Sequence, residues 1–424
     1  MQQGEAAEDI VIVGAGLAGL ATALGLHRKG VRSLVLESSP ALRASGFAFT
    51  AWKNAFRALD ALGVGDKIRR QHPQVQAYVA LYTSYLRFLC LRLRVMSSST
   101  GEVAQELDLK VQGKQGPNEI RCVRRDFLLR ALEEELPTGT IRYSSKVVLI
   151  EEDSDVKILH LVDGSILRAK VLIGCDGINS LVAKWLGLAT PSYSGRMAAR
   201  GLAHYPDGHG LEPKSLQFIG HGFRSGMRPC NETDIYWFFT WTPSENNKCV
   251  NENATKMRQF VLTSLRGLKV PAEALAVIER TPMSDVVAVP LRFRPPLSLI
   301  TASISKGNVC VAGDALHPMT PDLAQGGCSA LEDAIILARC LGKAVLDEGA
   351  RGGAENKRIE AGLREYAEIR RWRSVQLIAT AYMVGFIQQS NNVIVSFLRD
   401  KFLSGLLARR LLKMADYNCG TLWS

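Results

Sequence analysis

Three glycines near the start of the chain have the spacing of a nucleotide-binding turn. Gly14-Ala15-Gly16-Leu17-Ala18-Gly19 reads GxGxxG and stands between an apolar run and a helical pattern. The first glycine of such a turn permits a tight bend, the second lets the backbone approach a pyrophosphate, and the third allows strand and helix to pack closely. The N-terminus of the next helix adds positive potential. The spacing predicts a dinucleotide site, with a plain tight turn as the alternative.

A carboxylate follows this turn at a suitable distance. Glu37 lies 18 residues after Gly19, at the end of the second predicted strand. A carboxylate in this position can accept hydrogen bonds from both ribose hydroxyls. We assign Glu37 and the adjacent Ser38 to the nucleotide site, with a solvated strand-end carboxylate as the alternative for Glu37.

Two later segments distinguish between nucleotides. Gly174-Cys175-Asp176-Gly177 and Gly313-Asp314 each follow a short apolar run. Carboxylates at the carboxyl ends of parallel strands face the crevice in which open α/β sheets bind ligands. Asp314 could accept hydrogen bonds from a ribityl chain, which FAD has and NAD lacks. The sequence therefore favours FAD as the resident nucleotide.

The elements that position these residues can be read from the apolar runs. The pattern predicts buried parallel strands at 10–13, 33–36, 171–173 and 309–312. It predicts helices over 54–62, 122–136, 330–341 and 361–414. We predict an α/β fold, in which a βαβ FAD-binding domain (1–75, 113–193 and 296–345) is interleaved with a β-sheet substrate domain (76–112 and 194–295). A C-terminal helical region (346–424) follows.

Together these segments resemble a known family. The chain resembles single-component FAD-dependent monooxygenases of the aromatic-hydroxylase fold, which contain the same motifs in the same order: GAGLAG with Glu37, then CDGINS, then GDALHPMTPDLAQGGC. ALEDAIILARC and DYNCGTL look like the plant group related to salicylate hydroxylase and zeaxanthin epoxidase. The resemblance implies tightly bound FAD, NADPH or NADH as a transient co-substrate, and O₂. It also implies insertion of one oxygen atom, through a flavin C4a-hydroperoxide, into a small aromatic, indolic or terpenoid substrate.

The resemblance assigns further residues to the cofactor. It places Arg43 near the diphosphate and Arg124, which is adjacent to Arg125, near the ribityl–phosphate region. It links Asp176, followed by Gly177, with both FAD and NADPH. For either arginine an exposed charge is the alternative.

A second glycine pair should face the flavin. Gly326-Gly327-Cys328 open a predicted helix, whose free backbone N–H groups can stabilise negative charge on the pyrimidine edge of a reduced flavin. Ala324 replaces the first glycine of the family's GQGG, and we expect this to stiffen the loop.

Candidate catalytic and substrate residues are fewer. His317 and Pro321 lie between Asp314 and the glycine pair, so both should be near the flavin ring, although a structural histidine is the more common case. In 235–241 strand alternation places Tyr236 and Phe238 on one face, which we assign to the pocket. Arg224 could bind a substrate carboxylate, with a solvated loop charge as the alternative.

Composition limits the other possibilities. The net charge of +11 has no long basic block or reading motif, so nucleic acid is not an expected partner. Nine cysteines without a CxxC pair predict neither a disulfide framework nor a metal site. We recognise no transmembrane span and no targeting signal, which predicts a cytoplasmic location, with peripheral membrane contact through 403–413 possible. The alternatives are an FAD-dependent epoxidase, reductase or oxidase, or a non-catalytic flavoprotein; the oligomeric state is open.

Overall fold

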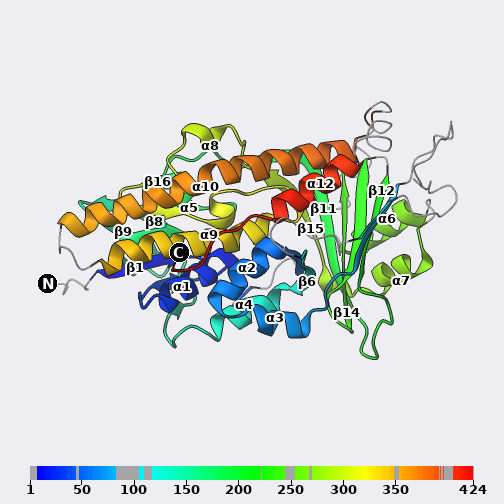
Figure 1. Ribbon diagram of the computed structural model, residues 1–424, viewed down its shortest axis with the longest axis horizontal. Coiled ribbons are helices and arrows are strands. Elements are labelled where there is room, and N and C mark those ends of the chain that lie inside the picture. The colour runs from blue at the N-terminus through cyan, green and yellow to red at the C-terminus, as the bar shows by residue number, and fades with distance from the viewer. Residues whose placement is uncertain are drawn as a thin grey trace.

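Two large β-sheets lie at opposite ends of an elongated molecule, with long helices running between them (Figure 1), and a third, small sheet has two strands. The structure is a computed structural model, which describes residues 7–43, 47–82, 105–108, 117–220, 222–243, 254–266, 270–347, 353–390, 392, 395 and 404–423. Within the predicted substrate segment 76–112, residues 83–104 and 109–112 lie outside the described residues.

The first sheet contains eight strands and forms the nucleotide-type unit. Its path is β16-β17-β10-β1-β2-β7, extended by β9 and β8. The strands are β1 (Glu8–Val13), β2 (Leu34–Leu36), β7 (Ile141–Arg142), β8 (Val147–Asp153), β9 (Val156–Leu161), β10 (Ile166–Gly174), β16 (Ser305–Lys306) and β17 (Val309–Val311). β1 pairs in parallel with β10 and β2, and β10 pairs in parallel with β17. Helices cover these central strands, which explains their continuous apolar sequences.

The parallel pairing brings three distant turns to one edge. The glycine-rich turn follows β1, Gly174–Gly177 end β10, and Gly313–Asp314 follow β17. Because parallel strands end at the same edge of a sheet, segments separated by up to 300 residues meet there. This is the edge at which the sequence predicted the nucleotide site.

The second sheet is formed by strands from the segments that were predicted to form the substrate domain. Its order is β15-β11-β14-β13-β12-β4-β5. The strands are β4 (Ala77–Tyr82), β5 (Gln105–Asp108), β11 (Ser192–His204), β12 (Lys214–Gly220), β13 (Phe223–Pro229), β14 (Asp234–Trp241) and β15 (Val286–Phe293). Two helices, α6 (Ala254–Arg266) and α7 (Ala272–Arg280), pack against one face. Segments of the two sheets thus alternate along the chain, as predicted. The exact domain boundaries stay a prediction.

One predicted helix is partly wrong. Residues 122–136 were expected to be helical throughout, but β6 (Ile120–Arg124) pairs antiparallel with β3 (Ala48–Trp52), and α4 (Arg125–Glu133) begins only afterwards. The β-branched residues Ile120 and Val123 fit a strand, and pairing with a segment 70 residues away overrides the local helical pattern.

The remaining helices surround the first sheet and connect it to the second. They are α1 (Leu17–Arg28), α2 (Lys53–Leu62), α3 (Gly65–Gln71), α5 (Leu181–Trp185), α8 (Ser298–Thr301), α9 (Gly326–Leu346), α10 (Gly353–Gln388) and α12 (Ser404–Ala415), with short 3₁₀ turns η2 (Met283–Asp285), η3 (Gly313–Ala315) and η4 (Pro321–Leu323). α10 lies along α9 and extends towards the second sheet, where α12 also lies (Figure 1). No described helix combines the length and apolar character that crossing a membrane requires.

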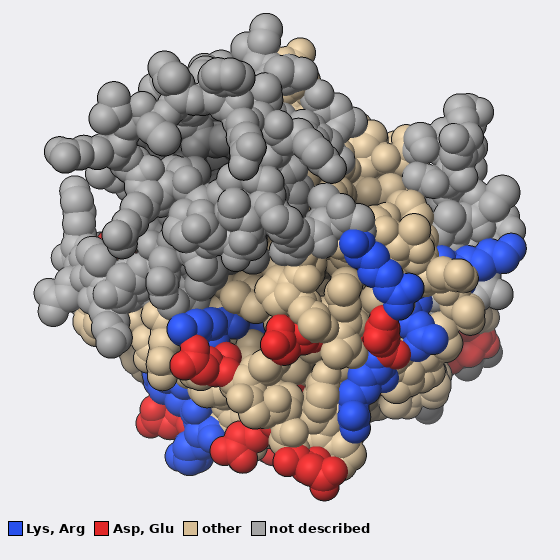
Figure 2. All heavy atoms as spheres, turned by 90° about the vertical axis from the view of Figure 1, so that its right-hand side faces the viewer, with Lys and Arg blue, Asp and Glu red and all other residues tan. Residues whose placement is uncertain are grey.

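The charge of the protein is mixed at the end of the molecule formed by the second sheet. Figure 2 shows blue and red side chains interspersed over the described part of this face. The described part of this face therefore shows no continuous positively charged surface of the kind that binds nucleic acid.

Candidate active site

Two adjoining pockets lie between the sheets. The glycine-lined pocket is bordered by Gly16, Gly177 and Asp314 of the three turns and by Gly326 at the start of α9, and its volume is about 1090 Å³ including its open mouth. The aromatic pocket is bordered by the second sheet and encloses about 700 Å³. Both pockets are lined by Ala48, Phe49, Arg200, Pro321 and Ala324. A ligand in one pocket would therefore lie against the same wall as a ligand in the other.

The glycine-rich turn is shaped by close backbone approach. Gly14 has φ +102°, and a Cβ atom built on it would lie 2.5 Å from the carbonyl oxygen of Cys175. A Cβ atom on Gly19 would lie 1.9 Å from the carbonyl oxygen of Gly14. These glycines join strand and helix tightly, while Gly16, Leu17 and Ala18 line the pocket. Ala15 instead donates its backbone N–H to Glu37 Oε2 at 2.9 Å.

Glu37 is held at the end of β2. Its Oε1 also accepts the backbone N–H of Ser39 at 2.8 Å, and the side chain is nearly buried. Arg43 is exposed, donates to Ser38 Oγ at 2.9 Å and approaches Glu37 at 3.4 Å. The three predicted residues Glu37, Ser38 and Arg43 therefore lie together beside the glycine-rich turn.

Of the two adjacent arginines, the structure places Arg125 and not Arg124 on the glycine-lined pocket. The guanidinium of Arg124 lies 2.7 Å from both Asp126 Oδ2 and Asp234 Oδ2, and it ties β6 to the second sheet. Arg125 Nε is buried, and no residue in the described part of the chain forms a hydrogen bond with it. Burial lowers the pKa of Arg125, and the Asp314 carboxylate partly offsets this effect.

The two carboxylates after β10 and β17 differ in their surroundings. Asp176 Oδ2 accepts the backbone N–H of Leu181 at 2.7 Å at the start of α5, and burial raises its pKa. Gly177, at φ +79°, lines the pocket, but Asp176 does not. Asp314 is exposed and lines the pocket, and no described residue hydrogen-bonds to its side chain. Asp314 is thus available to accept hydrogen bonds from a ligand.

The N-terminus of α9 opens into the glycine-lined pocket. Gly326 and Gly327 line it, the first turn of α9 contains no acidic residue, and the side chain of its N-cap residue Gln325 makes no capping hydrogen bond to the described residues. The N–H groups and dipole of this 21-residue helix therefore favour an anionic group. The side chain of Cys328 is fully buried and does not line the pocket, so only its backbone is suited to the predicted role.

Ala324 precedes this helix in a left-handed conformation, at φ 51° and ψ 36°. The sequence predicted that an alanine in place of glycine would stiffen this loop. The structure shows that the position demands positive φ, which a side chain disfavours by roughly 1–2 kcal/mol.

His317 lies outside both pockets. It is fully buried, and its Nε2 lies 2.6 Å from Asp333 Oδ2. Asp333 also accepts the backbone N–H of Gly313 at 2.7 Å and Arg370 Nε at 2.6 Å. Although burial opposes ionisation, His317 and Arg370 hold the pKa of Asp333 below its ordinary value. This buried network fixes the Gly313–Asp314 turn, so its geometry supports a structural role for His317 rather than the candidate catalytic one. Pro321, the other candidate, lines both pockets.

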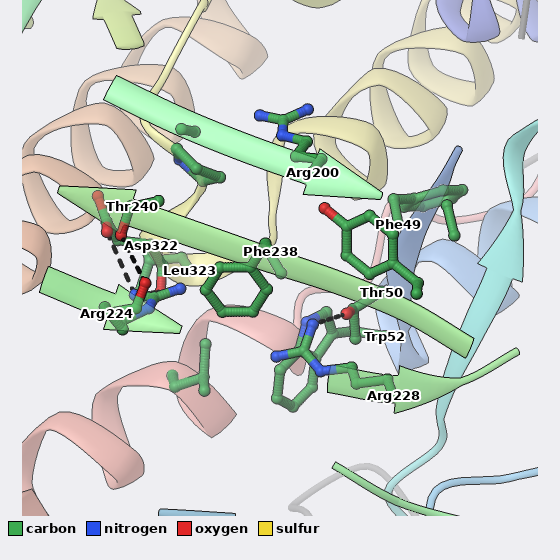
Figure 3. Close-up of a pocket in the computed structure, with 16 residues that line it drawn as sticks. Phe49, Thr50, Trp52, Arg200, Arg224, Arg228, Phe238, Thr240, Asp322 and Leu323 are labelled. Carbon is green, nitrogen blue, oxygen red and sulfur yellow. Dashed lines mark hydrogen bonds and ion pairs between the residues drawn. The ribbon is translucent and has the colours of Figure 1, made fainter. Parts of the chain in front are cut away.

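Aromatic and cationic side chains line the aromatic pocket (Figure 3). Tyr236 and Phe238 lie on its wall, whereas Trp237 and Phe239 point into the core beneath α6 and α7. The Phe238 ring lies between two guanidinium groups, at 5.1 Å from Arg224 Cζ and 5.8 Å from Arg228 Cζ. The alternation of β14 thus places the predicted face on the pocket.

Arg224 lines the aromatic pocket, but its guanidinium group is also bound by other side chains of the protein. Its Nη1 donates to Asp322 Oδ1 at 3.2 Å and to Gln388 at 2.6 Å. Asp322 also pairs with Arg196 at 2.8 Å. Burial would raise the pKa of Asp322, but Arg196 and Arg224 lower it below its ordinary value. This group joins η4, the second sheet and the end of α10.

Two pocket arginines were not predicted from the sequence. Arg228 Nε donates to Ser215 Oγ at 2.6 Å, and its Nη1 donates to Thr50 Oγ1. Arg200 lines both pockets, and among the described residues none hydrogen-bonds or pairs with it. Strand alternation relative to Ala198, another pocket residue, would have placed Arg200 on the same face.

Comparison with known proteins establishes the class that this fold and these pockets define. A family described as "FAD binding domain" matches residues 7–380. The chain belongs to this family and is an FAD-dependent oxidoreductase of the monooxygenase group. This confirms the family resemblance that the sequence motifs indicated.

Individual relatives cover almost the whole chain. "Monooxygenase 2" of Arabidopsis thaliana is 48% identical over 99% of both chains. A "6-hydroxynicotinate 3-monooxygenase" of Bordetella bronchiseptica is 28% identical over 80% of this chain and 84% of its own. The crystal structure of Klebsiella pneumoniae HpxO "complexed with FAD and uric acid" superposes with a TM-score of 0.78 over 96% of both chains, at 22% identity, and confirms the fold.

Proposed function

We propose that the protein binds FAD in the glycine-lined pocket and inserts one oxygen atom from O₂ into an anionic aromatic compound in the aromatic pocket, with NADPH or NADH as reductant. When bound, FAD supplies the redox chemistry and the activation of O₂. The protein binds, orients and shields the reactants. The observation that carries the proposal is the wall shared by two pockets of different chemistry.

The donors and acceptors of the glycine-lined pocket fit FAD. The unpartnered Nε of Arg125 offers a donor and a positive charge to a phosphate, and the exposed Asp314 offers acceptors to ribityl hydroxyls. Gly326 and Gly327 at the start of α9 offer backbone N–H groups to the anionic edge of a reduced flavin. Glu37 lies where it can exchange its bond from Ala15 for ribose hydroxyls.

The charges of the aromatic pocket favour an acidic substrate. Three guanidinium groups (Arg200, Arg224 and Arg228) and one carboxylate (Asp322) line it. Guanidinium groups bind carboxylates through charge-assisted hydrogen bonds, and the burial of Arg224 and Arg228 strengthens the attraction. Tyr236 and Phe238 supply aromatic surface for the ring of the substrate. The acidic heteroaromatic compounds named for the Bordetella and Klebsiella relatives agree with this choice.

The test combines cofactor content, isotope incorporation and a matched substrate series. Purified protein should show a flavin absorption spectrum, and NADPH or NADH oxidation should be stimulated by aromatic carboxylates more than by their carboxamides. Products formed under ¹⁸O₂ should gain one labelled atom. Protein that neither contains nor binds FAD would refute the proposal, and full turnover without label would assign a reductase or oxidase instead. Labelled epoxide as product would select the epoxidase alternative, and the absence of any turnover with bound FAD would select a non-catalytic flavoprotein.

A further inference from the structure

Two cysteine side chains from different parts of the chain meet behind the aromatic pocket. The sulfur atoms of Cys122, on β6, and Cys230, directly after β13, are 3.2 Å apart, and both thiols are free. Both residues are fully buried. The contact joins positions 108 residues apart in sequence, so it depends on the tertiary fold.

The two segments that carry the cysteines are already held in place. Two residues after Cys122 on β6, Arg124 pairs with Asp234 at 2.7 Å, at the start of β14. Cys230 donates its backbone N–H to the carbonyl oxygen of Asp234 at 2.8 Å. Since alternate residues of a strand face the same side, the ion pair and the sulfur contact link the same two segments side by side.

The pair packs directly against the pocket wall. Cys122 and Cys230 form one buried cluster with Ala48, Tyr236 and Phe238, all three of which line the aromatic pocket. A small oxidant in the pocket is therefore separated from the sulfur atoms by one layer of side chains.

We propose that Cys122 and Cys230 form a reversible disulfide when the protein is exposed to hydrogen peroxide. In the first step one thiol is oxidised to a sulfenic acid, and one molecule of water is released. The second thiol then attacks the sulfenic sulfur, a second molecule of water leaves, and the S–S bond forms. In sum, two thiols lose two electrons and two protons, and one peroxide is reduced to two molecules of water.

Proximity decides which thiols react with each other. Burial and the contact with Cys122 raise the pKa of Cys230, so the first oxidation should be slow. The second step is intramolecular between atoms already in contact, so it should be fast. A disulfide bond is about 2.05 Å long, so the sulfur atoms need to approach by only about 1 Å. The bond would fasten the β13–β14 turn to β6 and restrain the wall that carries Tyr236 and Phe238.

The experiment is a peroxide titration of the purified full-length protein, read by mass spectrometry. Trypsin should release residues 122–124 and 225–248, because the Arg228-Pro229 bond resists cleavage. In peroxide-treated wild type these peptides should be joined, with a loss of two hydrogens, and dithiothreitol should separate them. Cys122→Ser and Cys230→Ser should give no joined peptide, whereas Cys340→Ser, which removes a buried cysteine elsewhere, should behave as wild type.

A second measurement does not depend on the variants. The thermal midpoint of wild type should rise by a few degrees after peroxide and return after dithiothreitol, because the bond closes a long loop. The proposal is overturned if peroxide oxidises other cysteines of wild type before any 122–230 cross-link forms. It is also overturned if the cross-link joins Cys122 or Cys230 mainly to another cysteine.

Discussion

Arg124 and Arg125 are neighbours in the chain, yet only Arg125 lines the glycine-lined pocket, while Arg124 lies 2.7 Å from Asp234 of the second sheet. The strand β6 ends and the helix α4 begins between them. The two residues therefore serve different purposes, one available to a ligand and the other joining the two units.

This division predicts opposite effects of two matched substitutions. Arg125→Gln should raise the Kd for FAD at least about tenfold, equivalent to about 1.4 kcal/mol, because it removes a charge from the pocket. Arg124→Gln should change this Kd less than threefold and instead lower the free energy of unfolding. Fluorescence titration of apoprotein with FAD, together with urea denaturation, separates the effects. The reverse pattern would restore Arg124 as the cofactor residue.

Arg200, which has no hydrogen-bond or ion-pair partner among the described residues, should determine the preference for an anionic substrate. Arg200→Gln should raise the Kd of an aromatic carboxylate about 10- to 100-fold, because a charge-assisted hydrogen bond at a partly buried site is lost. The corresponding carboxamide should bind wild type and variant about equally. Calorimetric titration of the FAD-loaded protein measures both constants. Equal weakening of acid and amide would contradict the assignment.

The left-handed conformation of Ala324 predicts a stabilising substitution. Ala324→Gly should raise the free energy of unfolding by up to about 1 kcal/mol, because glycine adopts positive φ without steric cost. The control Ala379→Gly, in the interior of α10, should lower it by about 1 kcal/mol. Urea denaturation compares the two. Destabilisation of both variants would show that Ala324 is not strained.

Because His317 is buried outside both pockets, its substitution should lower the free energy of unfolding but leave the pH dependence of NAD(P)H oxidation unchanged. His317→Asn should lower the free energy of unfolding by about 1–3 kcal/mol, because Asp333 loses a buried partner. The pH dependence of NAD(P)H oxidation should keep its shape, since His317 lines neither pocket. Loss of one limb of that profile would identify His317 as an acid or base in the reaction.

The lowered pKa of Asp322 predicts a pH-dependent contribution to stability. A carboxyl group whose folded-state pKa lies below its ordinary value near 3.8 stabilises the fold above that value, and the contribution is lost as the pH falls through the folded-state pKa. Asp322→Asn should cost about 3–5 kcal/mol at pH 7, and the difference from wild type should shrink below pH 4. Urea denaturation at pH 7, 5 and 3 tests this. The exposed Asp66→Asn is the control and should show no comparable trend.

The sequence was most informative where local pattern and function coincide. The apolar runs before Gly14, Gly174 and Gly313 predicted strands correctly because parallel strands are buried on both faces. The segment after Ile120 was misread because its strand partner, β3, is distant in sequence. Pairing between distant segments leaves little local signal.

The site was predictable to a similar extent. Glycine motifs and strand-end carboxylates carry their chemistry in their spacing, so the sequence indicated the sheet edge that borders the glycine-lined pocket. Alternation in β14 also placed Tyr236 and Phe238 on the pocket wall. Arg200 and Arg228 were missed because a lone arginine in a strand looks like a solvated charge until the opposing unit covers it.

The alternation of β14 has an evolutionary consequence. Tyr236 and Phe238 border the pocket, whereas the alternate residues Trp237 and Phe239 pack in the core. Neighbouring codons of this strand therefore specify different tasks, one set the pocket wall and the other the packing of the core. Substitutions at alternate codons would therefore change the surface that faces a ligand while the residues packed in the core stay the same.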